Sequence, residues 1–266
     1  MHRGLEMTMP APPRLGAIVL AGGRSSRMGA PKALLDWHGG SLVRRVTGIL
    51  QRLADPVVVV YADGQELPPL QGVERVADRA PGRGPLEGIA TGLRAVAGRC
   101  PAVFVSGTDL PLLHPDLVLA LATERGEHDA AVPVADGHDH HLCAVYGSDL
   151  LPAVERQLAG DRLRVGLLLE GIDVLRLEAT ALPHPEALRN LNTDAEYRRA
   201  LAEPQPRITL GRGLAQGSVR AATLGEAIRL APALAVALPG RTLRLNGAAV
   251  EPDPSLPLVE GDLLEL

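Results

Sequence analysis

The stretch LGAIVLAGGRSSRMGAPK, residues 15–32, decides the fold. Its first seven residues form a continuous apolar run that ends at a glycine pair, which is typical of a buried strand entering a tight loop. Glycines at such a turn let backbone N–H groups approach phosphate oxygens closely. The stretch closes on Lys32, the single lysine among 27 Lys and Arg residues. It therefore predicts a strand followed by a phosphate-binding loop.

Further apolar runs and helical patterns follow this strand. Residues 56–62 and 100–109 read as two more buried strands, and residues 42–53 and 84–97 read as helices. Continuous apolar strands that alternate with helices favour a parallel sheet covered on both faces, hence an α/β fold. Ligands of such sheets bind at the carboxyl ends of the strands, where the glycine loop, Asp78 and the SGTD segment all fall.

Composition excludes several classes of protein. With 31 acidic against 27 basic residues and a net charge of −4, nothing favours binding to nucleic acid or to a membrane surface. No apolar run reaches the roughly 18 residues of a membrane span. Residues 1–14 lack the apolar segment of a signal peptide and are expected to be a disordered leader. Cys100 and Cys143 are expected to be reduced thiols of a cytoplasmic protein.

The glycine loop fits neither of two common phosphate loops. The dinucleotide fingerprint needs a third glycine that is missing here, and the P-loop needs a lysine directly after its glycine. The pattern L-A-G-G-x-S-x-R-M-G-x-x-K at 20–32 instead resembles nucleotidyltransferases, most closely the molybdenum cofactor guanylyltransferases. The resemblance implies that Arg27 and Lys32 neutralise the phosphates of a nucleoside triphosphate. It implies a nucleotide-contacting backbone at Leu20, Ala21, Gly22 and Gly23.

A second segment, 75–93, carries an aspartate shortly before a G-P-L-x-G loop. The resemblance implies that Asp78, with Gly84, Pro85 and Leu86, frames the base and ribose. The combination of L-A-G-G with P-L-x-G resembles guanine users, whereas cytosine-using relatives carry L-A-A-G. An ordinary Pro-Gly turn with a helix-capping carboxylate remains the alternative.

Asp109 is the strongest metal candidate. An apolar strand brings it to a carboxyl end, and Mg²⁺ prefers carboxylate oxygens together with substrate phosphates. The segment G-T-D-L-P at 107–111 resembles the family's metal-binding element, which implies Mg²⁺ or Mn²⁺ at Asp109. A simple turn-forming aspartate is the alternative.

Two segments are candidates for binding the acceptor. Asn190 and Asn192 stand in N-L-N-T-D, which resembles a family motif whose second asparagine holds the metal or the acceptor phosphate. The pair Asn192-Thr193 would also serve as a helix N-cap. The histidines at 138–141 lack a fourth ligand for zinc and favour a solvated loop. The resemblance nevertheless places His141 in a loop that faces the pterin substrate, and it places Arg162 and Arg164 near the cleft.

The last 60 or so residues differ in character from the rest. Residues 201–207 contain two prolines and charges and read as a linker between a domain at 15–200 and one at 208–266. The second domain resembles a β-grasp sulfur carrier, with a helix capped by Thr223 and Glu226. Sulfur carriers end in Gly-Gly, whereas this sequence ends in Leu-Glu-Leu. We therefore expect either a docking or stabilising module, which would contact a molybdoenzyme or another protein of the cofactor pathway, or a sulfur carrier whose tail is missing from this sequence.

Together these features predict a Rossmann-like three-layer nucleotidyltransferase domain with a β-grasp domain appended. The resemblance implies transfer of GMP from GTP to molybdopterin or molybdenum cofactor, with Lys32, Arg27 and Asp109 as the catalytic residues. Two alternatives stay open. The enzyme could transfer cytidylyl or another nucleotidyl group to a different phosphorylated small molecule, or the chain could be an inactive nucleotide-binding module that presents its second domain to a partner.

Overall fold

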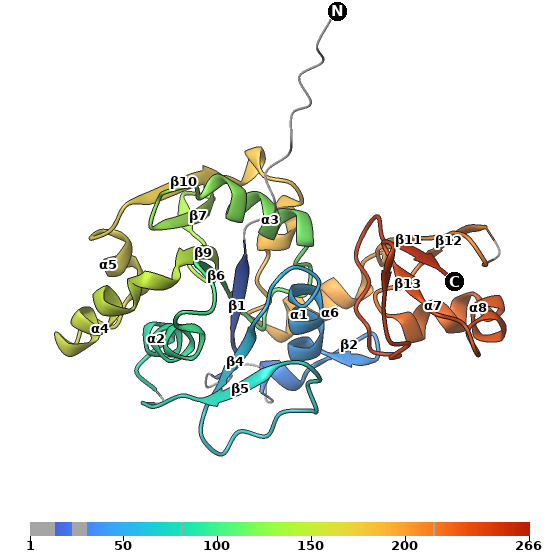
Figure 1. The fold of residues 1–266 in the computed structure, drawn as a ribbon, viewed down its shortest axis with the longest axis horizontal. Helices are drawn as coiled ribbons and strands as arrows, with labels where there is room; N and C mark the ends of the chain where they lie inside the picture. The colour runs from blue at the N-terminus through green and yellow to red at the C-terminus, as the bar shows by residue number, and fades with distance from the viewer. Residues whose placement is uncertain (1–13, 23–30, 81, 215) are drawn as a thin grey trace, which may run out of the picture.

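The structure, a computed structural model, describes residues 14–22, 31–80, 82–214 and 216–266. The predicted leader, Gly23 and Arg27 thus lie outside the described residues, apart from residue 14 at the end of the leader. The centre is a mostly parallel sheet in the order β10-β7-β9-β6-β1-β4-β5, with β8 paired to β7 (Figure 1). Its strands are β1 (Leu15–Leu20), β4 (Val57–Tyr61), β5 (Glu74–Ala77), β6 (Ala102–Gly107), β7 (Ala130–Ala135), β8 (His138–Asp139), β9 (Cys143–Gly147) and β10 (Val174–Glu178).

Strand β1 occupies the middle of the sheet because it is apolar on both faces. It pairs in parallel with β4 and with β6, and Leu20 at its end is level with Val60 and Gly107. The carboxyl ends of these three strands therefore open at one edge of the sheet. Strand β9 pairs antiparallel with both β6 and β7, which makes the sheet mixed.

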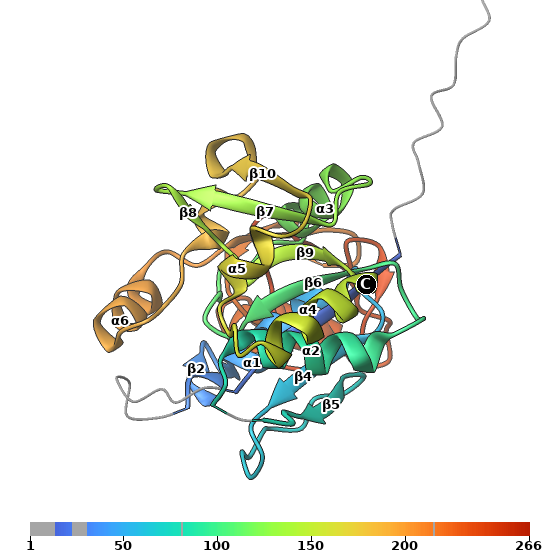
Figure 2. The same ribbon diagram turned by 90° about the vertical axis from the view of Figure 1, so that its left-hand side faces the viewer.

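Helices cover both faces of this sheet. Alternate residues of β1 enter different cores, with Ala17 and Val19 on one face and Ile18 on the other. The first face packs against α1 (Leu42–Leu50) and α3 (Pro115–Glu124). The second packs against α2 (Pro85–Val96), α4 (Leu151–Ala159) and α5 (Val165–Leu169), which lie in front of the sheet in Figure 2. The prediction of an α/β fold with a mostly parallel sheet is confirmed.

Short elements connect these layers. They are η1 (Lys32–Leu34), β2 (Asp36–Trp37), β3 (Gly40–Ser41), η2 (Ser148–Leu150), η3 (Ala179–Ala181), η4 (Pro185–Leu188) and α6 (Asp194–Ala202). No helix among the described ranges has the length and apolar character needed to cross a bilayer.

The chain continues into a second, smaller sheet after α6. Its order is β12-β11-β15-β13-β14, with β11 and β15 parallel, and α7 and α8 pack beside it (Figure 1). The elements are β11 (Arg207–Leu210), β12 (Gly217–Arg220), α7 (Leu224–Leu230), α8 (Pro232–Ala237), β13 (Arg244–Leu245), β14 (Ala248–Ala249) and β15 (Leu263–Glu265). Thr223 caps α7 as expected, but Glu226 accepts from Ala222 N at 2.7 Å rather than from the cap residue itself.

Helix α1 joins the two sheets through a buried arginine. Arg45 is 5% exposed, and its guanidinium donates to the carbonyls of Pro111, Ala222 and Leu258. It also lies over the Trp37 ring, 5.7 Å from its centroid. Burial lowers the pKa of Arg45 to about 9, because a charge out of water is costly. The carbonyl oxygens and the ring face offset that cost.

We expect Arg45→Met to destabilise the fold by about 2–4 kcal/mol, because buried carbonyl groups lose their donor. The neighbouring Arg44→Met is the matched control, since Arg44 pairs with the half-exposed Asp253 and should cost less than about 1 kcal/mol. Urea unfolding of both variants measures the difference. Equal losses would contradict the structural role of Arg45.

Gly92 sets how closely α2 approaches β1. A Cβ at this position would lie 2.5 Å from Ile18 Cγ2. We expect Gly92→Ala to cost about 1–2 kcal/mol of stability, since overpacking outweighs the gain in helix propensity. Gly166→Ala in α5 meets no atom within 4 Å and should be neutral or stabilising. Thermal unfolding of the pair compares them, and a Gly92→Ala variant as stable as wild type would refute the close packing.

Candidate active site

A cleft of about 500 Å³ opens at the carboxyl ends of β1, β4 and β6. The loop after β1, the loop after β5 and the segment after β6 all contribute to its wall. Of the residues predicted to bind a nucleotide, those that line it are Leu20, Ala21, Gly22, Lys32, Asp78, Gly84, Pro85 and Asp109. Leu86 is buried in the core below it. The fold thus brings together three segments that lie far apart in the sequence.

Lys32 lies at the junction of these segments. Its Nζ donates to Asp109 Oδ2 at 3.1 Å and to Asn192 Oδ1 at 2.9 Å. The side chains of Lys32 and Asp109 are 21% and 23% exposed, so the ion pair is only partly screened by water. The predicted cation and the predicted metal-binding carboxylate therefore meet directly.

The backbone around Asp109 fixes the direction of its carboxylate. Gly107 ends β6, and a Cβ there would lie 2.5 Å from Asp109 Oδ1. The Asp109 carbonyl accepts from Leu191 N at 3.0 Å, which ties the segment after β6 to the segment before α6. A glycine at 107 therefore leaves room for this position of the carboxylate, and any larger residue would displace it.

Asn192 is held by the cap of α6. Thr193 accepts from Glu196 N at 3.2 Å, and Glu196 Oε2 accepts from the backbone N–H groups of Asn192 and Thr193 at 2.8 and 2.9 Å. The hydrogen bond from the Asn192 N–H has the largest effect in lowering the pKa of the Glu196 carboxyl group. Glu196 was not singled out from the sequence, although Thr193 followed by a glutamate three residues later is a capping-box pattern. The cap leaves the Asn192 amide directed at Lys32.

The loop after β5 frames the opposite wall. Asp78 N donates to Tyr61 O at 2.7 Å, and Asp78 Oδ1 accepts from Ala80 N at 3.1 Å. Gly84 adopts φ 90° as the N-cap of α2, a conformation that favours glycine. The start of α2 thus faces the cleft and adds partial positive charge there.

A second hollow of about 570 Å³ shares Gly82, Gly84 and Pro85 with the cleft. His141 and Arg164, predicted near the acceptor, line this second hollow. Among the described residues, His141 Nδ1 is buried without a hydrogen-bond partner, and burial lowers the pKa of this histidine. Asn190 is exposed, and Asn190 and Arg162 line neither hollow.

The cleft contains oxygen ligands suited to a hard divalent cation. The Asp109 carboxylate and the Asn192 amide oxygen both accept from the Lys32 ammonium, so the two oxygens already face one positive charge. Carboxylate and amide oxygens are ligands that Mg²⁺ accepts. Cys143 does not add a reactive group, because burial raises the pKa of its thiol to about 12. Both cysteines are free and buried.

Comparisons with known proteins show the family to which the chain is related. A family model described as "MobA-like NTP transferase domain" matches residues 17–172. The chain is 37% identical over 194 residues to a probable molybdenum cofactor guanylyltransferase of Mycobacterium avium, covering 71% of this chain and 96% of that protein. A protein of the same name from Mycobacterium marinum is 39% identical over 186 residues, covering 68% and 90%. These relatives match almost in full, whereas a substantial part of this chain lies outside the match.

A solved structure shows the same fold. The molybdopterin-guanine dinucleotide biosynthesis protein A of Archaeoglobus fulgidus superposes with a TM-score of 0.57 at 24% identity. The match covers 70% of this chain and 96% of that structure.

We expect Gly107→Ala to weaken binding of a nucleoside triphosphate with Mg²⁺ by about tenfold, because the added methyl group displaces the Asp109 carboxylate. Gly147→Ala is a matched control, since a Cβ at 147 also lies 2.5 Å from an aspartate two residues on, Asp149 Oδ1, outside the cleft. Isothermal titration of both variants makes the comparison. Unchanged affinity in Gly107→Ala would separate Asp109 from ligand binding.

Proposed function

The chain belongs to the family of MobA-like NTP transferases, and on that basis we propose that it transfers the GMP moiety of GTP to molybdopterin or molybdenum cofactor. A terminal phosphate oxygen of the acceptor attacks the α-phosphorus of GTP. The bond between that phosphorus and the oxygen bridging to the β-phosphate breaks, and pyrophosphate leaves. The observation that carries the proposal is the contact of Lys32 with Asp109 and Asn192 at the mouth of the cleft.

In this proposal the residues of the chain bind and orient the reacting phosphates. The backbone of Leu20, Ala21 and Gly22 receives the triphosphate beside the start of η1. The Lys32 ammonium neutralises charge on the departing pyrophosphate. Arg27, outside the described residues, is proposed to act with it. Asp109 and Asn192 would hold Mg²⁺ or Mn²⁺, which when bound supplies Lewis-acid stabilisation of the phosphate oxygens.

Release of Lys32 from Asp109 accompanies substrate binding in this scheme. The ammonium bonds both oxygens that the metal would use, and a flexible four-carbon stem lets it turn towards a phosphate. A guanidinium fork at the same position is larger and rigidly planar. This difference accounts for a lysine at 32 in a chain where every other strongly basic residue is arginine.

The base and the acceptor are proposed from the walls of the cleft. Asp78 and the Gly84–Pro85 loop are proposed to frame the guanosine, in agreement with the G-P-L-x-G pattern. The neighbouring hollow, with His141 and Arg164 at its edge, is proposed to receive the pterin. Asn192 would contact the metal or the acceptor phosphate, and Asn190, which is exposed, would contact the acceptor from outside the hollow.

The second sheet is proposed to be a β-grasp domain at 208–266. Support comes from its strand order, in which the first and last strands are parallel neighbours at the centre and a helix crosses between the second and third strands. The intervening loop, 203–206, is proposed as the boundary segment, shorter than the predicted linker because α6 extends to Ala202. We propose that this domain stabilises the segment after β6 through Arg45, and that it docks a protein of the cofactor pathway.

We expect purified protein to incorporate α-labelled GMP into molybdopterin in the presence of Mg²⁺, and to incorporate CMP at less than about a tenth of that rate. Thin-layer separation of the products measures the ratio. Retention of label from CTP at an equal rate would favour the cytidylyl alternative, and failure to bind either nucleotide by calorimetry would favour the inactive binding module.

We expect Lys32→Arg to lower kcat by about tenfold and Lys32→Ala by on the order of 100-fold, because a preorganised cation is displaced or lost. Arg44→Met, which removes a charge that pairs with Asp253 and does not line the cleft, is the control and should keep full activity. Steady-state pyrophosphate release measures the rates. A Lys32→Arg variant with wild-type turnover would remove Lys32 from the mechanism.

A further inference from the structure

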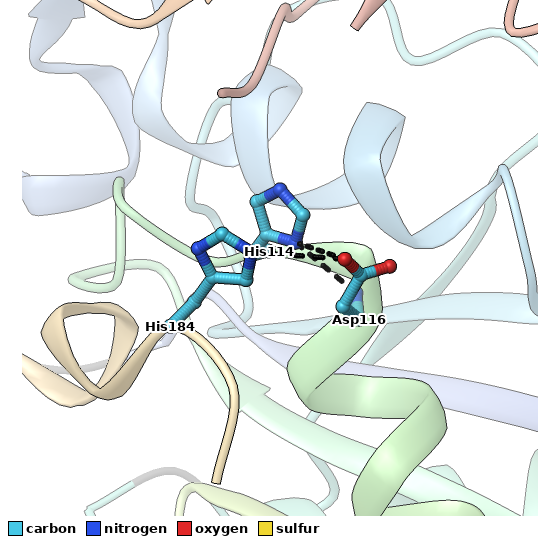
Figure 3. Close-up of side chains that lie close together, drawn as sticks. All are labelled: His114, Asp116 and His184. Carbon is cyan, nitrogen blue, oxygen red and sulfur yellow. Dashed lines mark hydrogen bonds and ion pairs between the residues drawn. The ribbon is translucent and has the colours of Figure 1, made fainter. Parts of the chain in front are cut away.

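A second group of potential metal ligands lies outside the cleft. His114, Asp116 and His184 each place one ligand atom within 4.8 Å of the others. His114 and Asp116 begin α3, and His184 precedes η4, so segments 70 residues apart meet here (Figure 3). None of the three lines the nucleotide cleft. Only the histidines at 138–141 were predicted from the sequence as candidate zinc ligands, although the closely spaced His114-Pro-Asp116 is a signal for this second group.

The hydrogen bonds of His114 fix its tautomer. Its Nε2 lies 3.0 Å from the carbonyl oxygen of Glu260, an acceptor, so Nε2 carries the proton. Its Nδ1 accepts from Asp116 N at 3.2 Å, so Nδ1 is unprotonated. That same Nδ1 faces Asp116 Oδ2 at 3.7 Å, as Figure 3 shows. An unprotonated nitrogen and a carboxylate oxygen thus face each other with no proton between them.

His184 repeats this arrangement from the other side. Its Nδ1 lies 3.1 Å from Glu186 Oε1, which accepts a hydrogen bond from Nδ1–H. The other ring nitrogen, Nε2, is therefore unprotonated. Nε2 faces the same Asp116 Oδ2 at 3.6 Å. Metal-bound histidines commonly donate their second ring N–H to a carboxylate or a backbone carbonyl, and here Glu186 and Glu260 provide one of each. Three potential ligand atoms therefore lie within 4.8 Å of one another, beside the carboxylates of Asp116 and Glu186.

We propose that His114 Nδ1, His184 Nε2 and Asp116 Oδ2 bind a divalent ion of the zinc class, with water as the fourth ligand. Two ligand atoms of a tetrahedral zinc site are about 3.4 Å apart, given Zn–N and Zn–O bonds near 2.1 Å. The distances of 3.6 and 3.7 Å to Asp116 are close to this value. This site is distinct from the Asp109 site of the proposed reaction, and it does not depend on that proposal.

Binding requires two adjustments, because the lone pair of His114 Nδ1 must give up its hydrogen bond from Asp116 N and the stacked rings must tilt apart. The two imidazoles are stacked, with centroids 3.5 Å apart and planes 20° apart, so their lone pairs run side by side. His114 is 8% exposed and is fixed by its bond to Glu260. The side chain of His184 is 26% exposed, and this residue sits in a turn at φ 52°. His184 is therefore the ring that tilts towards the ion, while His114 stays in place.

Such an ion would join three parts of the chain. It links the start of α3 to the turn before η4, and through the Nε2–H bond of His114 it polarises a contact with Glu260 in the turn before β15. The role is structural, with one ligand position open to water. The chemistry of two imidazoles and one carboxylate suits Zn²⁺ and Co²⁺ and does not suit Mg²⁺.

The test is a titration of the full chain with ZnCl₂, after a chelator has removed bound metal. Excess Mg²⁺ is present throughout, so that sites with oxygen ligands alone are already occupied. We expect the wild-type chain to bind one Zn²⁺. The affinity for this ion should be lost or lowered by about 100-fold in His184→Ala and in Asp116→Asn, and lowered by about tenfold in Glu186→Gln. The control is His128→Ala, which removes an exposed histidine paired with Asp173 at 2.9 Å. Calorimetry gives the affinity, and the visible absorption of bound Co²⁺ reports tetrahedral nitrogen and oxygen ligation.

Two results would overturn the proposal. One is a wild-type chain that takes up no Zn²⁺. The other is uptake with equal affinity and an equal Co²⁺ spectrum in His184→Ala and Asp116→Asn, which would assign the metal to other residues. Binding of GTP with Mg²⁺ should be the same in wild type and His184→Ala, so failure of the reaction proposal and failure of this site are distinguishable.

Discussion

The ammonium of Lys32 is the point on which the proposed site depends. It joins the end of the glycine loop to the segment after β6 and to the segment before α6, at 3.1 Å from Asp109 and 2.9 Å from Asn192. Two oxygen groups brought together at a partly buried position need a positive charge between them. The contact therefore holds the three segments around the cleft together, and in the proposed reaction the same charge neutralises the phosphates of the nucleotide.

Each partner of this lysine is positioned by a different physical constraint. Asp109 turns into the cleft because Gly107 leaves space for its carboxylate, and the following carbonyl of Pro111 accepts from the buried Arg45. Asn192 is directed by the helix cap that Thr193 and Glu196 form. The part of the chain after α6 enters this network because Arg45 also donates to the carbonyls of Ala222 and Leu258. An appended segment thus packs against the same loop that carries the metal-binding candidate.

Much of this arrangement could be predicted from the sequence, because parallel strands bring the loops at their carboxyl ends together. The apolar runs predicted β1, β4 and β6, and the resemblance identified Lys32, Asp78 and Asp109, which share one cleft. The hydrogen-bond partners of individual side chains were harder to predict from the sequence. The capping bonds of Glu196 and the three carbonyls around Arg45 come from segments distant in sequence, and no local periodicity encodes them. The proximity of His114 to His184 was not predicted, for the same reason.

The most direct test of the central claim is a crystal structure of the full chain with Mg²⁺ and a GTP analogue that has a methylene group between its α- and β-phosphates. Our interpretation expects the metal on Asp109 and the Lys32 ammonium on a phosphate oxygen, with the guanine against the loop at 82–85. A nucleotide bound elsewhere, while Lys32 still bonds Asp109 and Asn192, would contradict it.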